Sequence, residues 1–457
     1  MSSANPSNPY QTGADQIADP PVRLLDRIRY LGPGFILTAS IVGSGELIMT
    51  TQLGAKAGFV CLWVVIFSCL IKVAVQLEFG KHAIYAGETT FAAFNKLPGP
   101  KFGRANWSIW LWLALMPLKF LQVAGVVGGV ALILHKVVPS VGIVIWTAVT
   151  AASVALLVFR GKYGTIEKMS VLMIGAFTVL TLASVVMLQQ TDFAIGWADI
   201  AGGFTFELPT AYVAVALGAF GITGVGGDEI MAYNYWLVEK GYASKTGPRG
   251  DKSDPVWTAR ARGWIKIMYL DALLAMVAYT VVTAAFYVLG AAILKPQGLV
   301  PDGKSMVDTL SQMYTRTLGP GAMGIFLAGA FVVLYSTLLS ALGAWSRLFS
   351  DAFTRISGTD FNDPHVRNRL VAILAWVIPA IWGGLYLYFQ APGTMVMLGG
   401  IATALILLIV LFAAIHFRFR TLPAELKPSP VYDIAFWLSA LSIIGVGVYS
   451  VWSSLPK

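Results

Sequence analysis

Apolar stretches long enough to cross a membrane follow one another along most of this 457-residue chain. A membrane-spanning helix needs about 20 mostly apolar residues, and only helices and closed barrels satisfy their backbone groups in lipid. Eleven candidate helices occur, at about 33–55, 57–80, 107–134, 140–159, 166–188, 208–236, 264–293, 320–348, 369–389, 394–417 and 431–453. The sequence therefore predicts an all-α polytopic membrane protein with eleven transmembrane helices.

Composition argues against the main alternatives to this fold class. Only 12% of the residues are charged, whereas a soluble globular protein carries about 25%. The net charge of +9 does not indicate a nucleic-acid partner, because the basic residues lie in short stretches between apolar runs. Cys61 and Cys69 fall within one run, which predicts neither a disulfide framework nor a zinc site. An enzyme would need catalytic groups inside the spans, but the histidines lie at helix ends or in loops: His82, His135, His365 and His416.

The distribution of basic residues predicts an orientation. If the N-terminus is cytoplasmic, the cytoplasmic segments hold 24 of the 32 Lys and Arg residues, the outer segments hold six, and Lys72 and Lys119 lie within spans. Lys and Arg favour the cytoplasmic side of a membrane. We therefore expect a plasma (inner) membrane protein with its C-terminus outside. The polar residues 1–22 predict a disordered cytoplasmic tail.

Two apolar runs, five helices apart, carry matching interruptions. The first run contains Val42-Gly43-Ser44-Gly45-Glu46 and the sixth contains Val225-Gly226-Gly227-Asp228-Glu229, so both read Val-Gly-x-x-Glu. Paired broken helices at corresponding positions of two halves are typical of secondary transporters built from inverted repeats, and the substrate site lies at the breaks. We therefore expect the first and sixth helices to unwind near 43–46 and 224–228. Such breaks suit alternating access better than a channel.

The residues around the first interruption resemble the Nramp family of divalent-metal transporters. The similarity is carried by Leu31-Gly32-Pro33-Gly34-Phe35, by the break at 43–46, and by Gly54-Ala55-Lys56-Ala57-Gly58-Phe59 with Leu62-Trp63. The resemblance implies a LeuT-like fold of two inverted five-helix repeats plus an eleventh helix, and a transporter rather than an enzyme. The expected parts are a cytoplasmic tail (1–30), a first repeat (31–190), a second repeat (207–417), and a last helix with the C-terminus (429–457).

The metal ligands of the Nramp family are not retained. The family motif Asp-Pro-Gly-Asn, whose Asp and Asn bind metal, falls on Gly43-Ser44-Gly45-Glu46, and the family motif Met-Pro-His falls on Val225-Gly226-Gly227. Acidic residues that the family associates with proton transfer fall on Lys119 and Gln122. Selection of a transition metal normally uses a soft or borderline ligand. The chain therefore resembles a divergent, Nramp-related branch, and we expect little or no Mn²⁺ transport.

Three substrate classes remain open from the residues. A hard cation would take oxygen ligands from Glu46, Asp228 and Glu229, unless these acids only cap half-helix N-termini. A small oxyanion would use backbone N–H groups at the glycine-rich breaks together with Lys119, unless Lys119 only pairs with Glu46 or Asp228. An amino acid bound through its carboxylate would use the same amides.

The loss of cation ligands and the gain of a buried base favour the oxyanion, with bicarbonate as the concrete prediction and Mg²⁺ or Mn²⁺ as the alternative. We expect a small inorganic ion as the only partner besides the lipid bilayer, no cofactor, and coupling to Na⁺ or H⁺ through Glu46, Asp228 and Glu229. The predicted substrate-binding residues are Gly43, Ser44, Gly45, Glu46, Gly226, Gly227, Asp228 and Lys119.

Overall fold

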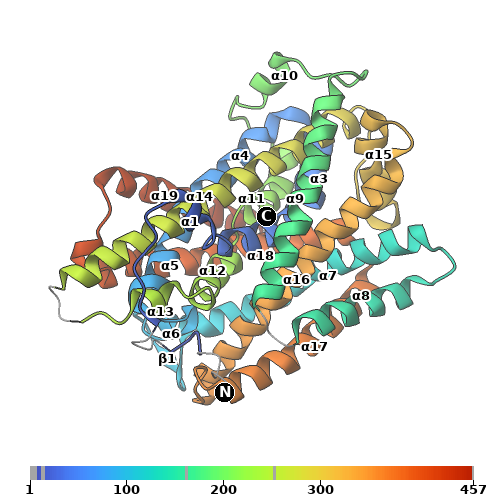
Figure 1. Cartoon of the computed structure of the whole chain (residues 1–457). Coiled ribbons are helices and arrows are strands. Elements are labelled where there is room, and N and C mark those ends of the chain that lie inside the picture. Colours follow the sequence, from blue (N-terminus) through green and yellow to red (C-terminus); the bar gives the residue numbers. More distant parts are fainter. Residues whose placement is uncertain (1–7, 12–15, 160–162, 251–253, 455–457) are drawn as a thin grey trace.

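Long helices build almost all of the structure, a computed structural model that describes residues 8–11, 16–159, 163–250 and 254–454 (Figure 1). Within these residues, eight helical runs are long and apolar enough to cross a membrane. The first of them, Pro33–Ala86, holds two membrane helices separated by a 3₁₀ turn at Gly58–Cys61. Two more helices contain the shorter apolar segments Ile143–Val158 and Thr178–Leu188. These runs account for the eleven expected helices.

The first five membrane helices occupy the N-terminal half. The first consists of α2 (Pro33–Ile41), a π-helix (Val42–Thr50) and α3 (Thr51–Ala57), and the second of α4 (Leu62–Ile71) and α5 (Val73–Ala86). The next three are α7 (Trp107–Val137), α8 (Ile143–Val158) and α9 (Tyr163–Leu188). The short helix α1 (Leu24–Ile28) precedes the first of them. The second and third are connected by α6 (Thr90–Phe94) and an antiparallel pair of strands, β1 (Lys101–Phe102) and β2 (Ala105–Asn106), in which Lys101 lies opposite Asn106.

The remaining six membrane helices follow in the C-terminal half. The sixth consists of α11 (Val213–Ile222) and α12 (Gly227–Glu239). The others are α14 (Pro255–Leu289), which continues as a π-helix (Gly290–Leu294), α16 (Ala322–Ser357), α17 (Pro364–Phe389), α18 (Pro392–His416), which continues as a π-helix (Phe417–Thr421), and α19 (Pro430–Ser454). Shorter helices are α10 (Trp197–Gly202), α13 (Tyr242–Thr246) and α15 (Met306–Leu318), with 3₁₀ turns at Thr210–Tyr212, Gly303–Ser305 and Ala424–Leu426.

Local sequence signals explain where two of the membrane helices begin. Asp254 caps α14, because its side chain accepts hydrogen bonds from the backbone N–H groups of Val256 and Trp257. Asp363 caps α17 in the same way, by accepting from the N–H of His365. In both helices proline occupies the first position, where its missing N–H costs nothing and its fixed φ suits the helix. Both capping aspartates precede the apolar part of their helix, so their charges stay outside the membrane-spanning segment.

Glycines let three helices approach closely at the centre of the protein. A Cβ on Gly399 of α18 would lie 2.2 Å from the Cβ of Gln122 in α7, and a Cβ on Gly221 of α11 would lie 1.9 Å from the carbonyl oxygen of Gly400. Small residues at helix interfaces in membranes permit this close packing. As a result α18 packs closely against both α7 and α11, the first half of the interrupted sixth helix.

The N-terminal segment packs against the folded helices. Tyr10 is buried and donates a hydrogen bond to Glu239 at the end of α12. Further along, the N–H of Ala18 donates to the carbonyl of Lys245, and the indole of Trp264 donates to the carbonyl of Ala18, both at 3.0 Å. The expectation of a disordered tail over 1–22 is therefore wrong for residues 8–11 and 16–22, because these residues find both apolar and hydrogen-bonding partners. Residues 1–7 and 12–15 lie outside the described part.

The connecting segments lie at two opposite ends of the helix bundle, as expected for helices that cross a membrane in alternating directions. The segment around α10 lies at the opposite end of the helix bundle from β1 (Figure 1). Which end faces the cytoplasm stays a prediction, as do the boundaries of the repeats at 31–190 and 207–417.

Candidate functional site at the broken sixth helix

The sixth membrane helix is interrupted where the sequence indicates. α11 ends at Ile222, α12 begins at Gly227, and the residues between them are not helical. Gly224 adopts a φ of +64°, and a Cβ there would lie 2.8 Å from the Cα of Cys69. Only glycine meets both demands without strain. The expected break at 224–228 is confirmed, although it begins at Thr223 and ends before Gly227.

The first membrane helix is widened, and it does not unwind. Val42–Thr50, which includes all four residues of the first interruption, forms a π-helix between α2 and α3. In a π-helix each backbone N–H bonds to a carbonyl five residues earlier. A Cβ on Gly43 would lie 1.9 Å from Thr337 Oγ1 of α16, so this glycine serves close packing. The expectation that residues 43–46 unwind is therefore wrong, because their backbone N–H groups belong to a continuous π-helix.

Lys119 reaches from α7 to the start of α12. Its Nζ lies 3.0 Å from Asp228 Oδ1 and donates to Gln122 Oε1 and Thr403 Oγ1, each at 2.7 Å. Asp228 Oδ2 accepts a hydrogen bond from the indole of Trp345 at 2.9 Å. Lys119 and Asp228 are 1% and 4% exposed. The structure thus joins two of the predicted site residues in a buried ion pair, and the Lys119 ammonium group donates two further hydrogen bonds to neutral side chains.

Glu229 carries the second carboxyl group at the start of α12. Its Oε1 accepts a weak hydrogen bond from Ser40 of α2 at 3.4 Å. Its Oε2 is buried, and no hydrogen-bond donor among the described residues reaches it. Asp228 and Glu229 are adjacent in the first turn of α12, so both carboxyl groups belong to the same edge of the break.

A small cavity lies in front of these two carboxyl groups. It is enclosed by α2, α12 and α16, and its wall includes Asp228 and Glu229. The cavity is amphipathic, since serine hydroxyls and carboxyl groups share the wall with aromatic and aliphatic side chains: Ile36, Leu37, Ser40, Ala232, Trp236, Ser340, Ala341, Ala344 and Trp345. The Asp228–Glu229 carboxyl pair is therefore the most polar part of an enclosed space at the helix break.

Glu46 lies on another side of the break. Its carboxyl group is fully buried, and Oε1 accepts a hydrogen bond from the N–H of Gly224 at 3.1 Å. Oε2 has no donor among the described residues. Glu46 therefore holds the loop between the two halves of the sixth helix. Gly226 and Gly227 precede the acids of α12, and a Cβ on Gly227 would lie 2.6 Å from Ile406 Cγ2. Of the remaining predicted residues, Ser44 and Gly45 belong to the π-helix of the first span.

Lys72 contacts the break but is not among the site residues predicted from the sequence. Its Nζ donates to the carbonyl oxygens of Phe220 at 2.8 Å and Thr223 at 2.5 Å, and lies 3.4 Å from that of Gly221. These carbonyls end α11, where a helix leaves its last acceptors unbonded. Ser68 adds hydrogen bonds to the same carbonyls of Phe220 and Thr223. The position of a lysine in the middle of an apolar run indicated a special role. Its partners could not be predicted, because these carbonyl oxygens become free only where α11 ends.

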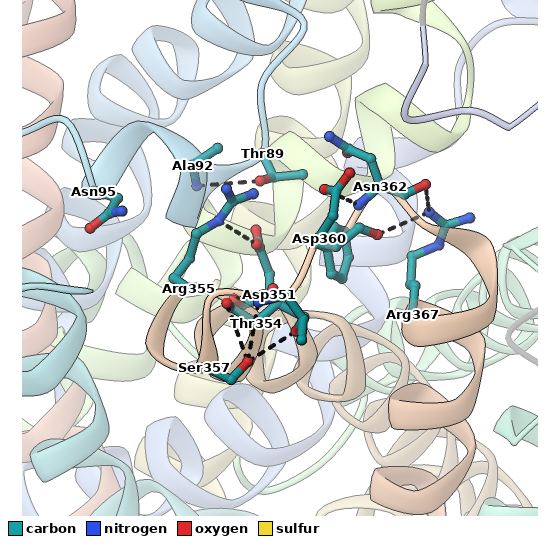
Figure 2. Close-up of polar contacts among 12 residues, drawn as sticks. Thr89, Ala92, Asn95, Asp351, Thr354, Arg355, Ser357, Asp360, Asn362 and Arg367 are labelled. Carbon is teal, nitrogen blue, oxygen red and sulfur yellow. Dashed lines mark hydrogen bonds and ion pairs between the residues drawn. The ribbon is translucent and has the colours of Figure 1, made fainter. Parts of the chain in front are cut away.

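A layer of charged side chains closes the end of the bundle beyond α12. Glu239 pairs with Arg347 through two contacts of 2.5 and 2.9 Å. Asp351 accepts from Arg355 at 2.9 Å, and these side chains face each other beneath Thr89, Asn95 and Asn362 (Figure 2). No group of three or more His, Cys, Asp or Glu side chains that could hold a metal ion is found where the chain is described.

Comparisons with known proteins extend the resemblance to the whole chain. The sequence model described as natural resistance-associated macrophage protein-like (Nramp) matches residues 34–453. The divalent metal cation transporter MntH of Brucella suis is 23% identical over 444 residues, which cover 93% of this chain and 86% of the relative. The MntH protein of Bacillus subtilis is 22% identical over 429 residues, which cover 92% and 91%.

Solved structures show the same fold. The manganese transporter of Eremococcus coleocola, in complex with an aromatic bis-isothiourea compound, gives a TM-score of 0.67 at 14% identity and covers 98% of this chain and 93% of its own. The transporter MhsT, bound to L-phenylalanine, gives a TM-score of 0.58 at 15% identity over 96% of this chain and 100% of its own. The chain belongs to the Nramp family of secondary transporters, and it is a polytopic membrane protein with the LeuT-like fold.

Proposed function

We propose that this protein transports a small, hard divalent cation, with Mg²⁺ as the first candidate, and that the Asp228–Glu229 carboxyl pair binds it. The observation that carries the proposal is the charge balance at the cavity. Two carboxyl groups share the start of α12, and Lys119 forms its ion pair with Asp228. A buried carboxylate is stable only when it is paired or protonated. A positive charge in the cavity, from either a proton or a metal ion, would therefore stabilise the second carboxylate.

The groups that an anion would need already have partners. Lys119 is held by Asp228, Gln122 and Thr403, and the amides of the first interruption lie in a π-helix. An oxyanion such as bicarbonate would enter a cavity whose polar wall is acidic. The oxyanion hypothesis from the sequence therefore loses an unpaired Lys119 and the amides of the first interruption, and its alternative, a divalent cation, takes its place.

The type of ligand favours a hard ion within that class. The MntH relatives are divalent metal cation transporters by name, and the position of their soft methionine ligand is Val225 here by the motif alignment. Carboxylate and hydroxyl oxygens remain, from Glu229, Asp228 and Ser40. Mg²⁺ prefers oxygen ligands and keeps several waters, whereas Mn²⁺ and Fe²⁺ gain from nitrogen or sulfur. A cation that binds to these carboxyl groups would compete with protons for the same oxygens, which would couple the two movements.

Replacement of Glu229 tests the assignment. Glu229→Gln keeps the size of the side chain and removes its charge, so Mg²⁺ uptake into proteoliposomes should fall by about tenfold or more, as expected when one charge-assisted contact of 1.5–3 kcal/mol is lost. Glu207→Gln is the matched control, because Glu207 is exposed in the loop that precedes α11. Unchanged Mg²⁺ uptake in Glu229→Gln would remove the carboxyl pair from the substrate site.

A further inference from the structure

We propose that Lys72 is a tethered cation: its ammonium group permanently fills a carbonyl site at the end of α11 that would otherwise attract a mobile ion. The inference concerns a different face of the break from the Asp228–Glu229 carboxyl pair. It does not depend on which substrate the protein carries.

The end of α11 has the features of a cation site. The last carbonyl groups of a helix lack partners within the helix, and the helix dipole adds about half a negative charge there. In transporters with broken helices, such half-helix C-terminal ends bind Na⁺ or H⁺. Here the carbonyl oxygens of Phe220, Gly221 and Thr223 all point to one position, and Lys72 Nζ occupies it at 2.5–3.4 Å.

The surroundings of Lys72 select an ammonium group for this position. Lys72 is 0% exposed, and Nζ lies 5.2 Å from the ring centroid of Phe220, within the range of a cation–π contact. Among the described residues Lys72 makes no ion pair with a carboxylate, so helix carbonyls are its main partners. A lysine used only to neutralise an acid would lie against that acid, as Lys119 does against Asp228.

The position of Lys72 in its own helix fits this role. The second membrane helix is interrupted at Lys72, between α4 and α5. Opposite it, Glu46 accepts a hydrogen bond from the N–H of Gly224. The loop of the sixth helix is thus held by a positive charge on its carbonyls and a negative charge on its amide. A lysine buried in a membrane helix is costly, and the contacts with three carbonyl oxygens offset this cost.

Fixed and exchangeable charges would then have separate roles at the break. A mobile ion would have to enter and leave the α11 site in each transport cycle, whereas a tethered ammonium stays. The geometry of the break is then independent of Na⁺, and ion exchange is restricted to other groups. Lys72 is in this sense a positioning residue, which acts through the carbonyl end of α11.

Chemical rescue tests the proposal. Lys72→Ala leaves a space next to the three carbonyls, so both thermal stability and transport should drop and then recover when methylammonium or Na⁺ is added. The midpoint of thermal unfolding of the purified variant should rise with the concentration of the cation, because only the folded state binds it. Recovery of Mg²⁺ uptake should saturate with the same concentration dependence. The wild-type protein should show neither effect.

Three further variants keep the test decisive. Lys72→Met fills the space without a charge, so it should lose about tenfold or more in uptake and resist rescue. Lys72→Arg retains a charged donor and should need no added cation for folding, which covers the case of an alanine variant that does not fold. Lys96→Ala is the matched control, since Lys96 is 66% exposed and pairs with Glu88 at the surface.

Two results would overturn the proposal. One is Lys72→Met with wild-type transport and stability. The other is a folded Lys72→Ala that shows no response of its unfolding midpoint to any added cation. The unfolding measurement needs no substrate, so a failure of the Mg²⁺ proposal alone would leave wild-type uptake absent but the cation-dependent stability of Lys72→Ala intact.

Discussion

Single residues at the break explain why charge can be kept inside the membrane. Lys119 and Asp228 are each almost fully buried and have each other as ionic partners. Removing one member of a buried pair leaves the other uncompensated, whereas removing both replaces two charges by neutral groups. The pair therefore predicts a distinct pattern in a mutational cycle.

The single variants Lys119→Met and Asp228→Asn should each lose about 3–5 kcal/mol of stability. The double variant should be clearly more stable than the sum of the two losses predicts, because no unpaired charge remains. Chemical or thermal unfolding of the purified proteins in one detergent measures all four members of the cycle. Strictly additive losses would mean that the pair does not interact as the distances indicate.

The sequence was sufficient to select these residues but not to pair them. A lysine deep in an apolar run and acids after paired glycines both stand out in the printed chain. Whether Lys119 meets Asp228 or Glu46 depends on how α7 packs beside α12 and α18, which is set by close contacts such as Gly399 against Gln122. The carbonyl partners of Lys72 were hidden for the same reason, since backbone acceptors exist only once α11 ends.

At the scale of elements, the two interruptions share a pattern and differ in structure. Gly43 permits α16 to approach the first helix, while Gly224 takes a left-handed conformation that ends α11. A glycine in a membrane helix can serve either purpose, so the repeated Val-Gly-x-x-Glu motif indicated a special segment in each half without specifying its conformation. The sixth helix breaks, and the first widens over Val42–Thr50.

Gly224→Ala tests the role of the break as an element. An alanine at φ +64° is strained by about 1–3 kcal/mol, and its Cβ would lie 2.8 Å from the backbone of Cys69. We expect lower thermal stability together with a loss of transport. Gly324→Ala in α16 is the control, because a Cβ there meets nothing within 4 Å. Equal behaviour of the two alanine variants would show that the conformation at Gly224 is not required.

At the scale of the whole molecule, hydrophobic length and charge patterning predicted the eleven helices and the fold class. The LeuT-like fold agrees with the solved relatives, and most membrane helices begin or end within a few residues of the apolar runs. The N-terminal segment departs from expectation, because Tyr10 and Ala18 find partners on helices far away in sequence. Burial and the neighbouring Glu239 carboxylate hold the pKa of Tyr10 well above its usual range, so this phenol stays a hydrogen-bond donor at physiological pH.

The central claim is that the site is built for a hard cation. The most direct measurement is uptake into proteoliposomes from one preparation of the wild-type protein, with Mg²⁺, Mn²⁺ and bicarbonate offered separately and then in competition. We predict saturable Mg²⁺ uptake, with weaker uptake or competition by Mn²⁺ and no effect of bicarbonate, because the enclosed cavity presents carboxyl oxygens without a soft ligand. Saturable bicarbonate flux in the absence of any divalent cation, with no Mg²⁺ uptake, would contradict the account.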